Sequence, residues 1–135
     1  MQPGLVVADR YRIEQLIGEG GIGRVYRARD IMTRELVALK TLRPEFARDN
    51  RIKRRFMREA RAVARLQHPN IVRLFTCGDA DDTPYIAMEL IDGTALSEHR
   101  DQGLHLDTLL TVVDQTLSAL AFAHARGVIH RDVKP

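Results

Sequence analysis

Four glycines within residues 18–23 constrain this chain more than any other feature of its sequence. The stretch Ile17-Gly18-Glu19-Gly20-Gly21-Ile22-Gly23-Arg24-Val25 places three of them at GxGxxG spacing. Strand-like runs precede it (residues 11–17) and follow it (residues 24–29), so the glycines lie at a hairpin tip. Backbone N–H groups without side chains around them can cradle phosphate. A plain glycine-rich turn is the alternative, and a dinucleotide fold is disfavoured because no helix follows the loop.

The apolar pattern before residue 92 predicts a small antiparallel sheet with a helix on one face. Its five strands are expected at residues 11–17, 24–29, 35–42, 71–75 and 85–90, with a turn at 78–84. The helix begins at a cap, Asp49 or Asn50, and runs to about Gln67, before Pro69.

A break at Asp92-Gly93-Thr94 separates this sheet from a helical continuation. A short helix is expected at residues 94–102, and a long amphipathic one from about Leu106 to Arg126, ended by Gly127. The apolar stripe of the long helix is formed by Leu110, Val113, Leu117, Leu120, Ala121 and His124. No apolar run approaches a membrane span, and the single cysteine, Cys77, excludes an internal disulfide.

Two charged residues break the apolar pattern of their own elements. Lys40 shares one face of its strand with Leu36, Ala38 and Leu42, because strand side chains alternate. Glu59 shares a helical stripe with Ile52, Phe56, Val63 and Leu66. Buried charges need partners, so Lys40 and Glu59 are expected to face each other. In the alternative, Lys40 extends to the surface and Glu59 lies at the edge of the stripe.

Positive charge is concentrated in residues 43–65, which hold nine Arg or Lys and three acidic residues, although the whole chain is only +3. The simplest interpretation is a solvated helix surface. A sharper one is a docking patch for an acidic partner or a phosphorylated loop. A nucleic-acid-binding helix over residues 51–65 is a third, but it leaves the glycine loop and Lys40 unexplained.

The last residues hold His130, Arg131, Asp132 and Lys134 within five positions. In an extended segment, Asp132 and Lys134 point the same way because they are two residues apart. The carboxylate could accept a proton while the ammonium stabilises negative charge. An exposed polar terminus is the alternative.

Taken in order, these motifs resemble the eukaryotic-type protein kinase family. They are Gly18-x-Gly20-x-x-Gly23-x-Val25, Val37-Ala38-Leu39-Lys40, Glu59 on a helix, and His130-Arg131-Asp132-Val133-Lys134-Pro135. Asp-x-Lys-Pro is similar to the serine/threonine branch, and the glycine loop and His68-Pro69-Asn70 are similar to bacterial members. The resemblance implies an α+β kinase fold: a tail (1–10), an N-lobe with its hinge (11–92), and the start of a helical C-lobe ending within the catalytic loop (93–135).

The resemblance also implies an ATP site and a catalytic pair. The loop would cover the phosphates, Val25 and Ala38 would sandwich the adenine, and Lys40 would hold the phosphates while paired with Glu59. Asp132 would orient or deprotonate the substrate hydroxyl, and Lys134 would neutralise the transferred phosphoryl group. The full ATP site would comprise Ile17, Gly18, Glu19, Gly20, Gly21, Ile22, Gly23, Arg24, Val25, Ala38, Lys40, Glu59, Met88, Glu89 and Ile91.

By the same resemblance the cofactors are ATP and Mg²⁺, with the metal ligands expected beyond the last residue and none within this chain. The expected function is phosphoryl transfer to Ser or Thr of a protein substrate in the cytoplasm, by an incomplete domain that is inactive alone and whose long helix lacks partners. A homodimer is compatible with the family; nucleic acid and a membrane segment are not expected. The alternative function is a non-catalytic module that binds a nucleotide or a partner.

Overall fold

The computed structural model describes residues 1–99, 102–131 and 133–134, and the chain divides into two compact units. The first unit comprises Met1–Arg65 and Arg73–Ile91. The second comprises Leu66–Val72 and Asp92–Pro135. The segment 66–72 therefore groups with the helical part, although in sequence it lies between elements of the sheet unit.

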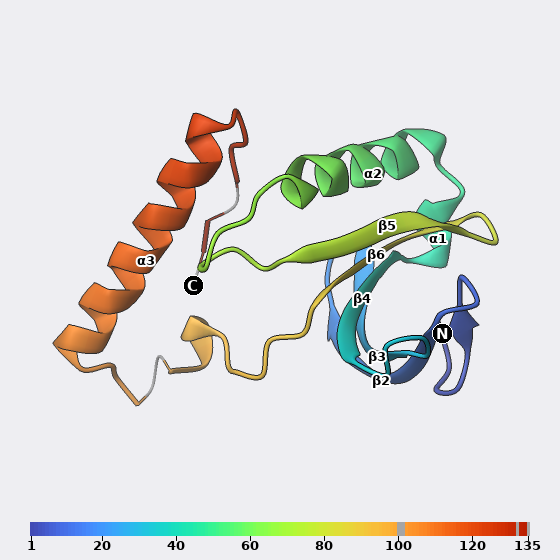
Figure 1. The fold of residues 1–135 in the computed structure, drawn as a ribbon, viewed down its shortest axis with the longest axis horizontal. Coiled ribbons are helices and arrows are strands. Elements are labelled where there is room, and N and C mark those ends of the chain that lie inside the picture. Colours follow the sequence, from blue (N-terminus) through green and yellow to red (C-terminus); the bar gives the residue numbers. More distant parts are fainter. Residues whose placement is uncertain (100–101, 132, 135) are drawn as a thin grey trace. The chain divides into compact units, whose positions relative to one another are not determined.

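The first unit is built on a six-stranded antiparallel sheet (Figure 1). Its strands are β1 (Val6–Val7), β2 (Tyr11–Glu19), β3 (Gly23–Asp30), β4 (Leu36–Leu42), β5 (Leu74–Ala80) and β6 (Thr83–Glu89). Their spatial order is β1-β2-β3-β4-β6-β5, and every neighbouring pair is antiparallel. The prediction of an antiparallel sheet with a helix is confirmed.

Six strands are present rather than the five expected. The additional strand, β1, has only two residues, too few for an alternating pattern to reveal. Residues 1–10, expected as a tail, are thus tied to the sheet: Gly4 N–H donates to the Ile13 carbonyl at 2.8 Å, and Val7 is buried. A short helix, α1 (Pro44–Ala47), follows β4 and was also not expected.

The strand expected at residues 71–75 lies further along the chain. Ile71 donates its N–H to the His68 carbonyl in a turn at 3.1 Å, so its apolar side chain does not mark a strand. Strand β5 continues past Gly78, where the ring of Tyr85 covers the space that a Cβ would take. The hairpin turn narrows to Asp81 and Asp82, which both have positive φ, as the two central residues of a type I′ hairpin turn do.

Helix α2 (Asn50–Ala64) lies along the sheet near β5 (Figure 1). Its cap is Asp49, whose side chain accepts hydrogen bonds from the N–H groups of Arg51 and Ile52. The helix ends about three residues earlier than expected, with Arg65 as its C-cap. The cap prediction is therefore confirmed in its first form, and the C-terminal boundary was placed too late.

Two apolar cores hold the sheet unit together. One packs Val7, Tyr11, Ile13, Tyr26, Ala28, Val37, Leu39 and Ala87. The other packs Phe56 and Ala60 of α2 against Leu42 and Ile86. Because Leu39 and Leu42 belong to different cores, β4 contributes to both faces of the sheet and has little solvent-exposed surface. This places its charged residue, Lys40, on the sheet face that packs against α2 rather than in open solvent.

The second unit contains a short 3₁₀ helix, η1 (Leu96–His99), and the long helix α3 (Leu106–Ala125). Gly127 follows the cap with φ +75°, its N–H donates to the His124 carbonyl, and Val128 N–H donates to the Ala123 carbonyl. This is a Schellman motif, which confirms Gly127 as the stop signal. His68 joins α3 through Ser118, at 3.1 Å from its Nε2, and packs on the ring of Phe122.

The apolar stripe of α3 is largely exposed, as expected for a helix without partners. Leu110, Val113 and Leu117 are 57%, 45% and 60% exposed. By length and composition α3 also meets the minimum for a membrane-crossing helix, with 20 residues and a mean hydropathy of 1.2, which corrects the expectation that no run approaches a span. One such helix is weak evidence for a membrane span, because core helices of soluble proteins meet the same limits of length and hydropathy.

Candidate functional site

The glycine loop between β2 and β3 carries backbone N–H groups with no partner in the described chain. Gly20 N–H closes the hairpin on the Gly23 carbonyl at 3.0 Å, whereas no hydrogen bond is recorded there for the N–H groups of Gly21 and Ile22. A Cβ added to Gly20 or Gly21 would meet nothing within 4 Å. None of the loop glycines has φ in the left-handed region. Glycine therefore serves here to keep amides open rather than to permit an unusual turn.

Gly23 is required for a different reason, namely close packing between strands. A Cβ at Gly23 would lie 3.1 Å from the Thr41 carbonyl oxygen and 3.5 Å from Cε of Lys40. The residue pairs with Leu42 across the β3–β4 ladder, so β4 passes directly against it. The last glycine of the motif thus brings Lys40 close to the base of the loop.

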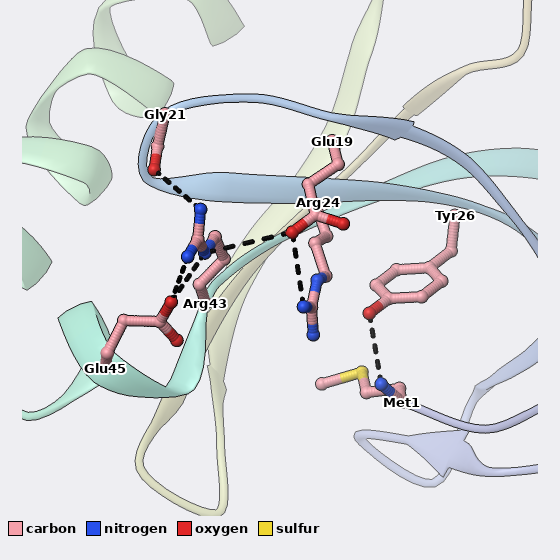
Figure 2. A network of polar contacts seen from close by, with 7 residues as sticks. All are labelled: Met1, Glu19, Gly21, Arg24, Tyr26, Arg43 and Glu45. Atoms are coloured by element: carbon pink, nitrogen blue, oxygen red, sulfur yellow. Dashed lines mark hydrogen bonds and ion pairs between the residues drawn. The ribbon is translucent and has the colours of Figure 1, made fainter.

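Arg43 fastens the loop tip to the end of β4 (Figure 2). Its guanidinium donates to the Gly21 carbonyl at 3.3 Å, and its backbone N–H donates to the Ile22 carbonyl at 2.9 Å. The same guanidinium binds Glu45 and lies 3.9 Å from Glu19. In a trans peptide the carbonyl and the following N–H point in opposite directions. Binding the Gly21 carbonyl therefore turns the Ile22 N–H away from Arg43.

Glu19 and Arg24 face each other across the base of the loop (Figure 2). Their side chains are 3.2 Å apart, and the hydrogen bond accepted by Glu19 raises the pKa of the Arg24 guanidinium above its ordinary value. Nε of Arg24 is buried and has no hydrogen-bond partner among the described residues. Ile17, directly before Gly18, and Ile22, between Gly21 and Gly23, are 47% and 41% exposed. The loop is thus held by an ion pair at its base and by hydrogen bonds from Arg43 at its tip, and it carries two partly exposed isoleucines.

The strand register places the other expected nucleotide contacts on one face of the sheet. Val25 pairs with Lys40, and Lys40 pairs with Ile86. Ala38 pairs with Met88 in the neighbouring row. Directly opposed residues of antiparallel strands share a face, so all five lie on the side that packs against α2. Lys40 Nζ lies 5.9 Å from the ring centroid of Phe56 in α2, which confirms the face predicted for this lysine.

The predicted pairing of Lys40 with Glu59 is not formed among the described residues. Glu59 is exposed and accepts a hydrogen bond from Arg55 Nε at 2.9 Å, one turn earlier on α2. The buried stripe of the helix is centred on Phe56 and Ala60, which are four residues apart. Glu59 lies beside Ala60 on the solvent side of that stripe. The helical periodicity had predicted it within the buried stripe, and that prediction is wrong.

The end of β6 is held by Arg73. Glu89 N–H donates to the Arg73 carbonyl at 2.8 Å, and the Glu89 carboxylate accepts from Arg73 N–H at 3.2 Å. Ile91, two residues later, is 57% exposed. Met88 is half-buried and packs against the α2 core. Of the expected catalytic pair, Asp132 lies outside the described residues; Lys134 is exposed and belongs to the second unit.

Sequence reasoning missed Arg43 as a site residue. Arg43 directly follows β4, the strand that pairs with the end of the loop. That position indicates a contact with the loop only once the β3–β4 register is known. Chemically, the assembled residues offer two open amides, one ammonium and an apolar strip beside them. This combination suits an anionic group attached to a flat apolar one.

Comparison with known proteins supports the protein kinase family over most of the chain. The family model described as "Protein kinase domain" matches residues 11–135. The serine/threonine-protein kinase PrkC of Bacillus subtilis is 42% identical over 134 residues, covering 98% of this chain, and PknB of Mycobacterium leprae is 41% identical over 135 residues, covering 96%. The chain spans 21% and 22% of the lengths of these two relatives.

A solved structure agrees with the sequence comparison. The kinase domain of Mycobacterium tuberculosis PknI matches with a TM-score of 0.83 and 34% identity. The match covers all of this chain and 56% of that one.

Proposed function

Because this chain belongs to the protein kinase family, we propose that it contributes the nucleotide-binding lobe of a serine/threonine kinase. The observation that carries the proposal is the pair of unpartnered amides at Gly21 and Ile22, with Lys40 beside the base of the same loop. Phosphoryl transfer depends mainly on positioning and on stabilising phosphate charge. The open amides can position a triphosphate by hydrogen bonds, and the ammonium of Lys40 can stabilise its negative charge.

The described residues fit ATP. The loop of residues 17–25 covers the phosphates, and the ammonium of Lys40 binds their oxygens. Val25 and Ala38 share one sheet face in adjacent ladder rows, so both contact the adenine from the same side and do not enclose it between them. Met88 lies at the back, and the backbone of Glu89 and Ile91 receives the adenine edge. Arg43 is a positioning residue, because it orients the loop amides without reaching the nucleotide itself.

Protein kinases use ATP together with Mg²⁺, but the described residues do not make a metal site. No group of three or more His, Cys, Asp or Glu side chains lies together among them. In the proposed reaction the hydroxyl of a substrate Ser or Thr gives its proton to Asp132 as its oxygen bonds the γ-phosphorus. The bond from that phosphorus to the bridging oxygen breaks, and Lys134 neutralises the charge of the moving phosphoryl group.

We also propose the division of the chain into two lobes, its protein partner and its cellular compartment. Residues 11–92 are the nucleotide-binding lobe with its hinge, and residues 93–135 begin the second lobe. The partner is a protein carrying a Ser or Thr acceptor in the cytoplasm, where ATP is available. A homodimer stays a prediction.

Nucleotide titration of the 135-residue chain tests the proposal. Replacing Lys40 with alanine should weaken ATP binding by about tenfold or more, the loss expected when a charged contact is removed from a phosphate site. Lys53→Ala is the matched control, since it removes the same charge from α2 outside the loop. Equal ATP affinity in the Lys40 variant and the unmodified chain would refute the assignment, as would equal losses in the two variants.

A second candidate function is a binding module without catalysis. The observation that favours it is Glu59, which is held by Arg55 instead of Lys40. Titration with and without Mg²⁺ separates the two candidates. Weak, metal-indifferent binding with no phosphate transfer favours the module, whereas phosphate transfer to a Ser or Thr peptide favours the kinase.

A further inference from the structure

Four arginines form one stripe along α2 and line a surface pocket. Arg54, Arg58, Arg61 and Arg65 follow one another at spacings of four, three and four residues, which places them on a single helix face. They line a cavity of about 520 Å³, together with the half-buried side chains of Lys53 and Met57. All four arginines are exposed, so their guanidinium groups surround the cavity while the apolar part of Met57 contributes to its base.

The stripe differs from the rest of the helix in its lack of acidic partners. On neighbouring faces Arg51 lies 3.9 Å from Asp49, Arg55 lies 2.9 Å from Glu59, and Lys53 lies 3.6 Å from Asp82. In the part of the chain that the structure describes, no carboxylate lies within 4.0 Å of Arg54, Arg58, Arg61 or Arg65. Arg54 only donates to the backbone carbonyl of Asn50.

Such a stripe opposes the stability of its own helix. Like charges three and four residues apart repel each other on a helix surface. The helix dipole disfavours Arg54 near the N-terminus and favours Arg61 and Arg65 at the C-terminal end, so it does not remove the repulsion between neighbouring arginines. A solvated surface explains exposed arginines, but it does not explain why the unpaired ones share one face and one cavity. An anionic ligand would relieve this repulsion.

We propose that the arginine stripe of α2 binds an extended acidic peptide segment of a partner protein. The four arginines span about 16 Å along the helix axis, with steps of roughly 4.5–6 Å. An extended chain presents side chains on one side every 6.7 Å or so. Carboxylates at alternate positions can therefore each reach an arginine, whereas one compact anion would engage only two neighbours. At the cavity edge, Lys53 lies 3.6 Å from one carboxylate, that of Asp82 in the β5–β6 turn.

Nucleic acid is a weaker fit for the same cavity. Single strands are held by aromatic side chains on which bases stack, in addition to basic groups. The residues lining this cavity are basic or aliphatic, and none is aromatic.

Fluorescence anisotropy with the full 135-residue chain and no nucleotide tests the proposal. The probe is a labelled peptide with glutamate at four alternate positions and serine between them, compared with an oligothymidylate of equal charge. The Arg58→Gln, Arg61→Gln variant should bind the peptide about tenfold more weakly, the loss expected for two solvent-accessible ion pairs. The Arg51→Gln, Arg55→Gln variant carries the same charge change on another face and should lose less than about threefold.

Each result decides the question. Selective loss in the stripe variant, together with a peptide-induced rise in melting temperature seen only when the stripe is intact, supports the proposal. Equal loss in both double variants overturns it, because binding would then depend on net charge alone. Tighter binding of the oligothymidylate than of the peptide, or no binding of the peptide, also overturns it. Circular dichroism of each variant confirms that α2 still folds, since neither pair touches the Phe56–Ala60 contact.

Discussion

Replacing Asp30 with asparagine tests how the β2–β3 hairpin is held in place. Asp30 is 3% exposed, and each oxygen of its carboxylate accepts two N–H groups. Oδ2 accepts from Nε and Nη2 of Arg10 at 2.9 and 2.7 Å. Oδ1 accepts from the backbone N–H groups of Met32 and Thr33 at 2.9 and 3.4 Å, in the turn that leads to β4. Asparagine has one such oxygen, so one set of donors loses its acceptor.

The expected cost follows from these contacts. Hydrogen bonds to charged groups contribute about 1.5–3 kcal/mol. The Arg10 side chain is 40% exposed and can turn to water, so we discount this to about 1–2 kcal/mol for Asp30→Asn. Arg10→Met should cost more, about 2–3 kcal/mol, because it leaves a buried carboxylate without its counter-charge.

Urea unfolding followed by tyrosine fluorescence measures both variants. All three tyrosines, Tyr11, Tyr26 and Tyr85, lie in the sheet unit, and the chain has no tryptophan, so the signal reports that unit alone. An Arg10→Met variant no less stable than Asp30→Asn would refute the assignment of a buried, paired carboxylate.

The same pair predicts a pH dependence. The hydrogen bond from Arg10, and then those from Met32 and Thr33, lower the pKa of Asp30 below its ordinary value, although burial opposes this. A carboxylate with a lowered native pKa stabilises the fold above its unfolded pKa, near 3.9 or so, and this contribution is lost as the pH falls through the native pKa. The stability gap between the unmodified chain and Asp30→Asn should therefore be complete at pH 7 and shrink below about pH 4. A gap independent of pH would contradict this reasoning.

Three further predictions concern the loop and Lys40. Gly23→Ala should destabilise the sheet by about 1 kcal/mol or more by crowding a β4 carbonyl and should weaken ATP binding, whereas Gly21→Ala, which meets open space, should leave urea stability within about 0.5 kcal/mol. Arg43→Gln should weaken ATP binding by roughly threefold in titration calorimetry, with stability nearly unchanged, because it frees the loop tip; unchanged affinity would remove Arg43 from the site. Arg55→Gln should raise ATP affinity about twofold if Glu59 becomes free to reach Lys40, since an exposed i,i+4 pair contributes only about 0.3–0.5 kcal/mol; weaker binding would contradict that exchange.

Local chemistry in the sequence determined much of this protein. Alternation placed Lys40 on the face toward α2, because side chains of a strand alternate whatever the strand packs against. Asp49 and Gly127 marked helix ends, because capping depends on the few residues around it. The glycine spacing located the loop with the open amides. The family resemblance also came from the order of such local motifs.

Only the tertiary structure decided which charges meet. The β3–β4 register brought Arg43 to the loop tip, and the pairing of Tyr11 with Asp30 across β2 and β3 brought Arg10 beside that carboxylate. The packing of Phe56 and Ala60 against the sheet left Glu59 on the solvent side of α2, away from Lys40, where its i,i+4 neighbour Arg55 binds it. These contacts depend on the register of strands and the rotation of a helix on a sheet. Both are set by the packing of the whole unit, which a one-dimensional pattern does not contain.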